Sequence, residues 1–187
     1  MNYLDWVKLD FVLAVLLTVI VPLLLLFLSF QEKTLLARLL AYWRVSALLA
    51  ISVYLLMAEL TVGLVTGVVA RALIPPVLWL GDGLMQSSHN LANVDSPLHK
   101  TFRTWRWTVS LYCVLGVAFT VPLLSCAWTG QVTEMCSDWF APPQVLGSLL
   151  HQPDTWPILG KYALIALGIY FVYLLMATAK LGLKLLR

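Results

Sequence analysis

The sequence predicts an all-α protein, a polytopic transmembrane helical bundle of about five spans that includes a central helical hairpin. Of its 187 residues, 61% are hydrophobic and only 11% are charged, more apolar surface than a soluble fold of this size can hide. The apolar residues also occur in runs of roughly 20, the length that a helix needs to cross a hydrocarbon core of about 30 Å. We therefore expect a single membrane domain, residues 1–187, with the lipid bilayer around it.

The first predicted span covers residues 11–30, an uncharged run that follows the mixed segment MNYLDWVKLD. Tyr3 and Trp6 in that segment are amphipathic rings suited to the headgroup layer, so we expect residues 1–10 to be an interfacial lead-in. Pro22 lies inside the run and predicts a kink that neighbouring helices can accommodate. The run is longer than the core of a usual signal peptide, which favours an uncleaved first helix.

The stretch 42–84 decides the topology, because it crosses the membrane either once or twice. A single helix over its apolar part, 45–80, would be about 54 Å long at 1.5 Å per residue. That length exceeds the hydrocarbon core even for a tilted helix. The chain must therefore break, and Gly63 between two threonines is the best place for a turn. The result is a helical hairpin with predicted spans at 45–60 and 67–84.

A turn near Gly63 places Glu59 and Arg71 at similar depth and makes them the candidate intramembrane ion pair. One interpretation is a proton or substrate site. The other, which we favour, is a structural pair, since a short hairpin needs an acid and a base near its turn simply to remain satisfied. Pro75 and Pro76 lie within the third span and predict a kink, because no set of ligands nearby suggests an ion-binding break.

Two segments between the spans are polar and rich in basic residues. The connector 31–44 has leucines at helical spacing and is expected to lie as a short amphipathic segment on the membrane. The stretch 80–106 is expected to be the longest loop. His89, Asp95 and His99 in that loop fit no strong metal-ligand spacing, so we expect solvated side chains and no metal site.

The fourth predicted span, 105–127, leads into a segment without lysine or arginine, 129–156. Cys126 and Cys136 are the candidate disulfide, which would stabilise this region by roughly 3 kcal/mol in an oxidising compartment. A structural disulfide and two free thiols are equally compatible with the sequence. A redox-active pair is less favoured, because there is no Cys-x-x-Cys and no flanking base. The fifth predicted span covers 157–176.

Five spans place the N-terminus outside, in a lumen or periplasm, and the C-terminus in the cytoplasm. Nine basic residues fall in the segments that would then be inside: Lys33, Arg38, Arg44, Lys100, Arg103, Arg106, Lys180, Lys184 and Arg187. Only Lys8 and Lys161 fall in outside or flanking segments. This bias follows the positive-inside rule, and it holds only if the central stretch crosses twice.

The sequence lacks the residue patterns that several kinds of cofactor or catalytic site require. A b-type haem needs histidines within spans, and His89, His99 and His151 all lie outside the predicted ones. Neither a His-Glu-x-x-His run nor a phosphate-binding glycine loop is present. The basic residues lie where membrane-flanking residues belong, so no nucleic-acid partner is expected. We therefore expect a non-catalytic protein without a cofactor.

Short stretches spread over nearly the whole chain form a recognisable pattern: LLAYWRV at 39–45, LLAISVYL at 48–55, LIPPVLW at 73–79, WRW at 105–107 and YC at 112–113. In these stretches the sequence resembles an uncharacterised family of small integral membrane proteins from cyanobacteria. That family carries acidic residues after the third span, where this chain reads GDGLMQ at 81–86. The resemblance implies a thylakoid or plasma membrane location and no established activity.

Three functions are compatible with the sequence. We favour a non-catalytic accessory or assembly subunit of a photosynthetic or respiratory membrane complex, which would co-purify with a larger complex. A small ion-coupled transporter would use Glu59 and Arg71. A thiol-redox membrane protein would use Cys126 and Cys136.

Overall fold

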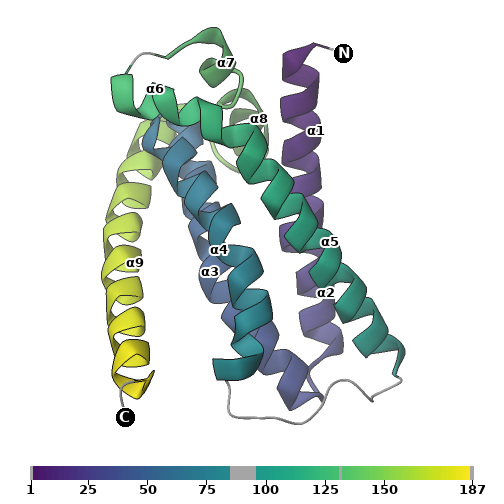
Figure 1. The fold of residues 1–187 in the computed structure, drawn as a ribbon. Helices are drawn as coiled ribbons and strands as arrows, with labels where there is room; N and C mark the ends of the chain where they lie inside the picture. Colours follow the sequence, from purple (N-terminus) through teal and green to yellow (C-terminus); the bar gives the residue numbers. More distant parts are fainter. Residues whose placement is uncertain (1, 85–95, 131, 186–187) are drawn as a thin grey trace.

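The structure is a computed structural model that describes the backbone of residues 2–84, 96–130 and 132–185, and the side chains of 2–79, 96–130 and 132–176. These residues form an all-α bundle without strands, as the sequence predicts (Figure 1). Five helical stretches are long and apolar enough to cross a membrane. The elements are α1 (Tyr3–Val15), the π-helical η1 (Leu16–Ile20), α2 (Val21–Leu28), α3 (Lys33–Met57), α4 (Val62–Leu84), α5 (Pro97–Thr120), the 3-10 turn η3 (Val121–Leu123), α6 (Leu124–Thr129), α7 (Glu134–Ser137), α8 (Ala141–Leu150), the 3-10 turn η4 (Pro153–Thr155) and α9 (Trp156–Leu185).

The first helical stretch, Tyr3–Leu28, runs through α1, η1 and α2. It begins at Tyr3, so the expected interfacial lead-in is instead about two turns of the membrane helix. Asn2 caps this helix, and its backbone N–H donates to the side chain of Asp5 at 3.0 Å. The helix therefore begins eight residues before the predicted start of the first span at residue 11.

Pro22 deprives one carbonyl of the first helix of its usual donor, and a buried tyrosine takes the place of that donor. Proline has no N–H for the carbonyl of Thr18, four residues earlier. The hydroxyl of Tyr42 on α3 donates to this carbonyl at 2.6 Å, and Tyr42 is fully buried. The proline thus creates a polar link between the first helix and α3.

The helix also widens just before this proline. In η1 the N–H of Val21 donates to the carbonyl of Leu16 and not to that of Leu17. The carbonyl of Leu17 accepts a hydrogen bond from Nε1 of Trp105 on α5 at 2.8 Å. The helix therefore has a π-helical turn before Pro22, and two aromatic side chains from other helices satisfy its carbonyls, while the kink predicted at Pro22 stays a prediction.

α3 begins at Lys33, so most of the connector 31–44 belongs to a spanning helix and does not lie on the membrane surface. Leu35, Leu39 and Tyr42 recur at helical spacing and are fully buried. The apolar stripe that suggested an interfacial segment therefore faces the core of the bundle.

α3 and α4 form the predicted hairpin, but the turn comes earlier than predicted. The chain turns at residues 58–61, where Glu59 has a left-handed backbone with φ of 59°. Gly63 lies in the first turn of α4, where a Cβ would lie 2.8 Å from Cγ of Leu56. The glycine therefore serves the close approach of the two helices and not the turn.

α4 continues to Leu84 with Pro75 and Pro76 inside it. Each proline removes a donor to the carbonyl four residues earlier, yet the helix does not end there. The kink that the sequence predicts at these two residues stays a prediction. The fourth and fifth predicted spans lie within the longer stretches Pro97–Thr129 and α9.

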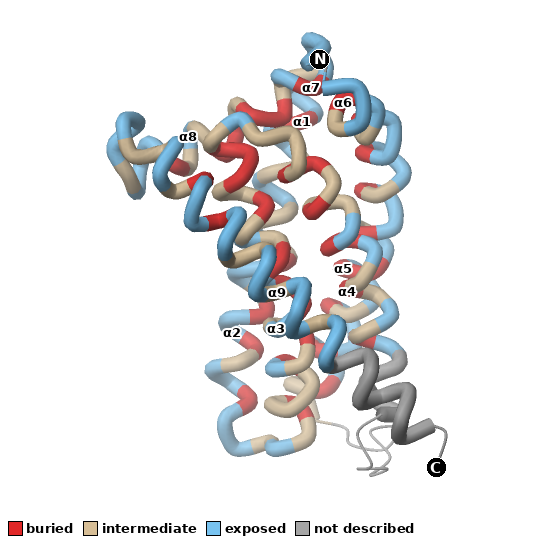
Figure 2. Tube along the Cα trace, turned by 90° about the vertical axis from the view of Figure 1, so that its left-hand side faces the viewer, coloured by how far each residue is buried: buried red, intermediate tan, exposed pale blue. Residues whose placement is uncertain are grey.

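The N-terminus lies at the same end of the bundle as the α3–α4 turn and helices α6, α7 and α8, while α9 finishes at the opposite end (Figure 1). We call these the N-terminal end and the C-terminal end. An odd number of spans requires termini at opposite ends, as observed. The buried residues form one cluster among α2, α3, α4 and α5 and a second one at the N-terminal end. Most residues in the described part of α9, 156–176, are exposed (Figure 2).

Candidate functional site

Arg71 of α4 is the centre of a polar cluster inside the bundle. Its side chain is only 9% exposed and forms an ion pair with the 12% exposed side chain of Asp10 on α1. Nη2 of Arg71 also donates to the Tyr112 hydroxyl of α5 at 3.2 Å. That hydroxyl lies 2.9 Å from both the Oδ1 atom and the backbone carbonyl of Asp10. Three helices therefore meet at one neutral, hydrogen-bonded group.

The two charges of this cluster lie about two turns or more inside their helices. Asp10 is about 10 Å along the first helix and Arg71 about 14 Å along α4, at 1.5 Å per residue. Against a hydrocarbon core of about 30 Å, neither lies at a helix end. Each charge therefore depends on the other for its solvation.

The side chain of Arg71 is closely surrounded by residues of α5 and by Trp139. A Cβ at Gly116 of α5 would lie 2.6 Å from Nη1 of Arg71. The rings of Tyr112 and Trp139 have their centroids 5.5 and 5.8 Å from Cζ, within the range of cation–π attraction. Nη1 has no hydrogen-bond partner among the described residues, so the cluster retains one unsatisfied buried donor group.

Arg71 does not pair with Glu59, contrary to the sequence prediction. Glu59 lies in the exposed α3–α4 turn, where its Oε1 accepts a hydrogen bond from Nε2 of Gln144 on α8 at 2.9 Å. Asp10 takes the place of Glu59 because α1 begins at Tyr3 and carries Asp10 into the bundle. The sequence prediction missed Asp10 because it assigned residues 1–10 to an interfacial segment outside the bundle.

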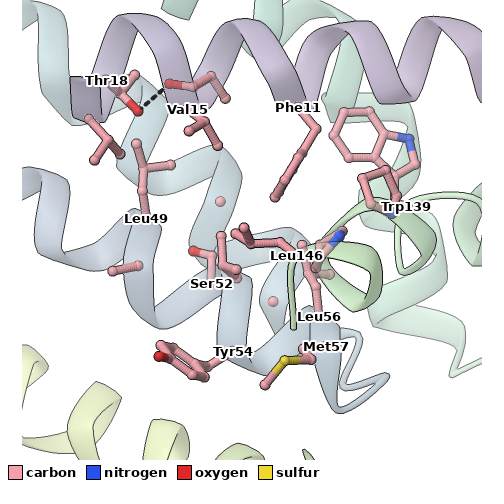
Figure 3. A pocket seen from close by; sticks show the side chains of 18 of the residues that line it. Phe11, Val15, Thr18, Leu49, Ser52, Tyr54, Leu56, Met57, Trp139 and Leu146 are labelled. Atoms are coloured by element: carbon pink, nitrogen blue, oxygen red, sulfur yellow. Dashed lines mark hydrogen bonds between the residues drawn. The ribbon is translucent and has the colours of Figure 1, made fainter. Parts of the chain in front are cut away.

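A cavity of about 550 Å³ lies between α1, α3, α4 and α8 (Figure 3). We call it the α1–α3 cavity. It follows α3 from Trp43 to Met57, about 21 Å at 1.5 Å per residue. Phe11 points into it from α1 and Leu146 from α8 (Figure 3). Its volume falls within the range of small-molecule sites.

Few polar groups of the α1–α3 cavity are available to a ligand. The hydroxyls of Thr18 and Ser52 donate to carbonyls of their own helices at 2.6 and 2.7 Å. At the N-terminal end, the Tyr54 hydroxyl lies 3.3 Å from Nε2 of His151, and both residues line the cavity. Arg71 is the charged side chain among the described lining residues, and Asp10 neutralises it.

Cys126 of α6 and Cys136 of α7 are both buried, and the structure places their sulfur atoms within bonding distance of each other. Their Cα atoms are 6.7 Å apart. They belong to an apolar cluster that includes Trp139 and Phe140 at the N-terminal end. This pair therefore connects α6 to the segment that leads into α8, one wall of the cavity.

Of the two histidines considered as metal ligands, His99 lies within the described residues. His99 is buried, with Nε2 3.7 Å from Glu32, so it is not the solvated loop side chain that we expected. His89 and Asp95 lie outside the described residues. Within the part of the chain that the structure describes, no group of three His, Cys, Asp or Glu residues could hold a metal ion.

A family model described as "Protein of unknown function (DUF3177)" matches residues 5–184, nearly the whole chain. The match includes Asp10, Arg71, the cavity-lining helices and both paired cysteines. No curated protein and no solved structure matches the chain.

Proposed function

We propose that this protein, which belongs to this family of proteins of unknown function, is a non-catalytic accessory or assembly subunit of a larger photosynthetic or respiratory membrane complex. The membrane is proposed to be a cyanobacterial thylakoid or plasma membrane. The N-terminal end of the bundle faces the lumen or periplasm, and the C-terminal end faces the cytoplasm.

The observation that carries this proposal is the free face of α9. This helix packs along α3, and its Gly160 lies against the α3–α4 turn, where a Cβ would lie 2.4 Å from Cβ of Ala58. On its outer face a Cβ at Gly168 would meet nothing within 4 Å, and Ile169 next to it is 68% exposed. A glycine on a membrane-facing helix is a usual contact point for a second helix.

The proposed orientation rests on two independent features. Lys33 and Arg38 lie in the first turns of α3 at the C-terminal end, where the positive-inside rule places the cytoplasm. The pair Cys126–Cys136 lies at the N-terminal end, and we propose that it is a disulfide formed in an oxidising lumen or periplasm. Arg44 gives no support, because it lies about 16 Å inside α3 and not in a connector.

The test is affinity purification of the tagged protein from gently solubilised membranes, followed by mass spectrometry. We expect the wild-type protein to elute with a larger complex and Gly168→Leu to lose it, because the leucine fills the contact point. Ala118→Leu is the matched control, since Ala118 is an exposed small residue on α5. A wild-type protein that elutes alone, or equal loss in both variants, would contradict the proposal.

Ion-coupled transport is a second candidate, and the buried Asp10–Arg71 pair beside the α1–α3 cavity favours it. An acid and a base in contact within a membrane can exchange a proton with a passing substrate. This candidate predicts that Asp10→Asn abolishes flux in proteoliposomes, whereas Glu59→Gln leaves flux unchanged. Equal flux in wild-type and Asp10→Asn vesicles would exclude it.

A further inference from the structure

We infer that the α1–α3 cavity is a binding site for an uncharged, single-tailed amphiphile with a carbonyl-bearing ring, the class to which isoprenoid quinones belong. The ring would lie against Tyr54 and His151 at the N-terminal end, and the tail would follow α3 toward Trp43. This site does not depend on the proposed complex, since its walls all come from this chain.

The first argument is that the cavity opens sideways into the bilayer. Val19 of η1 and Ala47 and Ala50 of α3 line it and are exposed. These three residues form a rim between the first helix and α3. Two of them are alanines, whose short side chains block little of the opening on the α3 side. A molecule dissolved in the membrane can therefore enter between the two helices without passing through water.

The second argument is that the cavity needs an apolar occupant. Its walls are mainly aliphatic and aromatic, with Phe11, Trp43 and Trp139 among them. Water enters a cavity only where two to four polar partners are available, and most polar groups here are already used by their own helices. A large empty apolar cavity is strongly unfavourable. A lipid-soluble molecule in the cavity removes both difficulties.

The third argument selects the head of this molecule. Tyr54 and His151 share one hydrogen bond at 3.3 Å, which leaves either the hydroxyl or the second ring nitrogen free to donate. A ring carbonyl matches such a donor. A phosphate or carboxylate head finds no spare charge, because the one cation of the described wall, Arg71, is neutralised by Asp10. The head is therefore neutral.

The fourth argument selects the tail. From Tyr54 to Trp43 the cavity extends about 16 Å along α3, slightly more than half of a hydrocarbon core of about 30 Å. A tail whose ring lies at Tyr54 can therefore extend inside the protein to about the middle of the bilayer. There the rim at Val19 and Ala47 lets a longer tail continue into lipid.

The experiment measures binding of a decyl-substituted benzoquinone to the full-length protein in nanodiscs, by quenching of tryptophan fluorescence. Trp43 and Trp139 line the cavity and report on its occupancy. We expect saturable quenching in the wild-type protein. The double variant Tyr54→Phe with His151→Phe removes both groups that could donate to the head and should weaken binding about five- to tenfold, the effect of one hydrogen bond. Ala50→Trp should abolish binding by closing the rim, whereas Ala118→Trp on α5 should leave it unchanged.

Two results would overturn the inference. One is quinone quenching of equal strength in the wild-type and Ala50→Trp proteins, which would place the quinone elsewhere. The other concerns brominated phosphatidylglycerol as a second quencher of the cavity tryptophans. If Ala50→Trp abolishes this quenching but excess quinone does not, the cavity is occupied by ordinary lipid. If Ala50→Trp does not elute as a folded protein on gel filtration, unchanged affinity in the double variant Tyr54→Phe with His151→Phe, which lacks both donors, is decisive against the site.

Discussion

Replacing Asp10 by asparagine is the most direct test of the polar cluster. The substitution keeps the shape of the side chain and removes its charge, so Arg71 becomes a buried cation without a counter-charge. Both side chains are nearly inaccessible, at 9% and 12% exposure. Removal of one partner of a buried ion pair typically costs roughly 3–5 kcal/mol. We expect about 3 kcal/mol, the low end of that range, because the amide oxygen can still accept from Arg71.

The matched control is Glu59→Gln, the same acid-to-amide change at the acid that the sequence favoured. Glu59 is exposed and accepts one hydrogen bond from Gln144, and the amide oxygen of glutamine preserves that bond. Exposed charges of this kind contribute about 0–1 kcal/mol. The structure therefore predicts a large effect at Asp10 and almost none at Glu59, whereas a Glu59–Arg71 pair predicts the reverse order.

The assay is reversible unfolding in mixed dodecyl maltoside and sodium dodecyl sulfate micelles, followed by tryptophan fluorescence and far-ultraviolet circular dichroism. The double variant Asp10→Leu with Arg71→Met completes the test. It removes both charges, so it should be more stable than the single variant Asp10→Leu, which leaves the cation alone. The reasoning fails if Glu59→Gln destabilises the protein as much as Asp10→Asn does.

Three further predictions concern packing and cross-linking. Gly116→Ala should lower the free energy of unfolding by about 1–3 kcal/mol in the same micelle assay, because its Cβ would lie 2.6 Å from the buried guanidinium; an unchanged free energy would contradict the geometry. Tyr42→Phe should cost about 1–3 kcal/mol in the wild-type background and less in Pro22→Ala, where a backbone N–H again reaches the carbonyl that the tyrosine satisfies. Equal losses in the two backgrounds would refute that coupling. Reduction of Cys126–Cys136 should lower the unfolding midpoint by the equivalent of roughly 3 kcal/mol, and Cys113→Ser, which leaves this pair intact, should keep that sensitivity to reductant.

The fold class and the hairpin could be predicted because they depend on apolar length and on the placement of charge. The turn could not be placed correctly, because two positions competed for it. Gly63 tolerates a left-handed backbone at no cost, so it was the better local candidate. The structure instead strains Glu59, with φ of 59°, and uses Gly63 where α4 approaches Leu56. That demand comes from the neighbouring helix and is invisible in a local pattern.

The candidate site shows the same division between local and non-local information. Arg71 was recognised as an intramembrane charge from its position within an apolar run. Its partner was sought nearby in the chain, and the actual partner, Asp10, lies 61 residues away. One signal was present, since α1 begins directly after Asn2 and carries an acid in its first turn, as helix starts do. The α1–α3 cavity had no sequence signal, because it is defined by four helices that meet only in the folded chain.

The way in which the first helix is attached explains why this cavity exists. Few residues of that helix are buried, yet side chains from the rest of the bundle hold it by hydrogen bonds at several heights. The donors that reach it are Tyr42, Trp105, Arg71 and Tyr112, and Trp139 reaches the hydroxyl of its Tyr3.

Within a membrane, helices gain no hydrophobic stabilisation from contact with each other, so such polar links can set their spacing. These links tie the first helix to α3 at Tyr42, to α4 at Arg71 and to α5 at Trp105 and Tyr112. Between these attachment points a space remains that side chains do not fill. A smaller separation would require the links at Thr18 and Asp10 to break. The cavity is therefore a consequence of the polar attachment of the first helix.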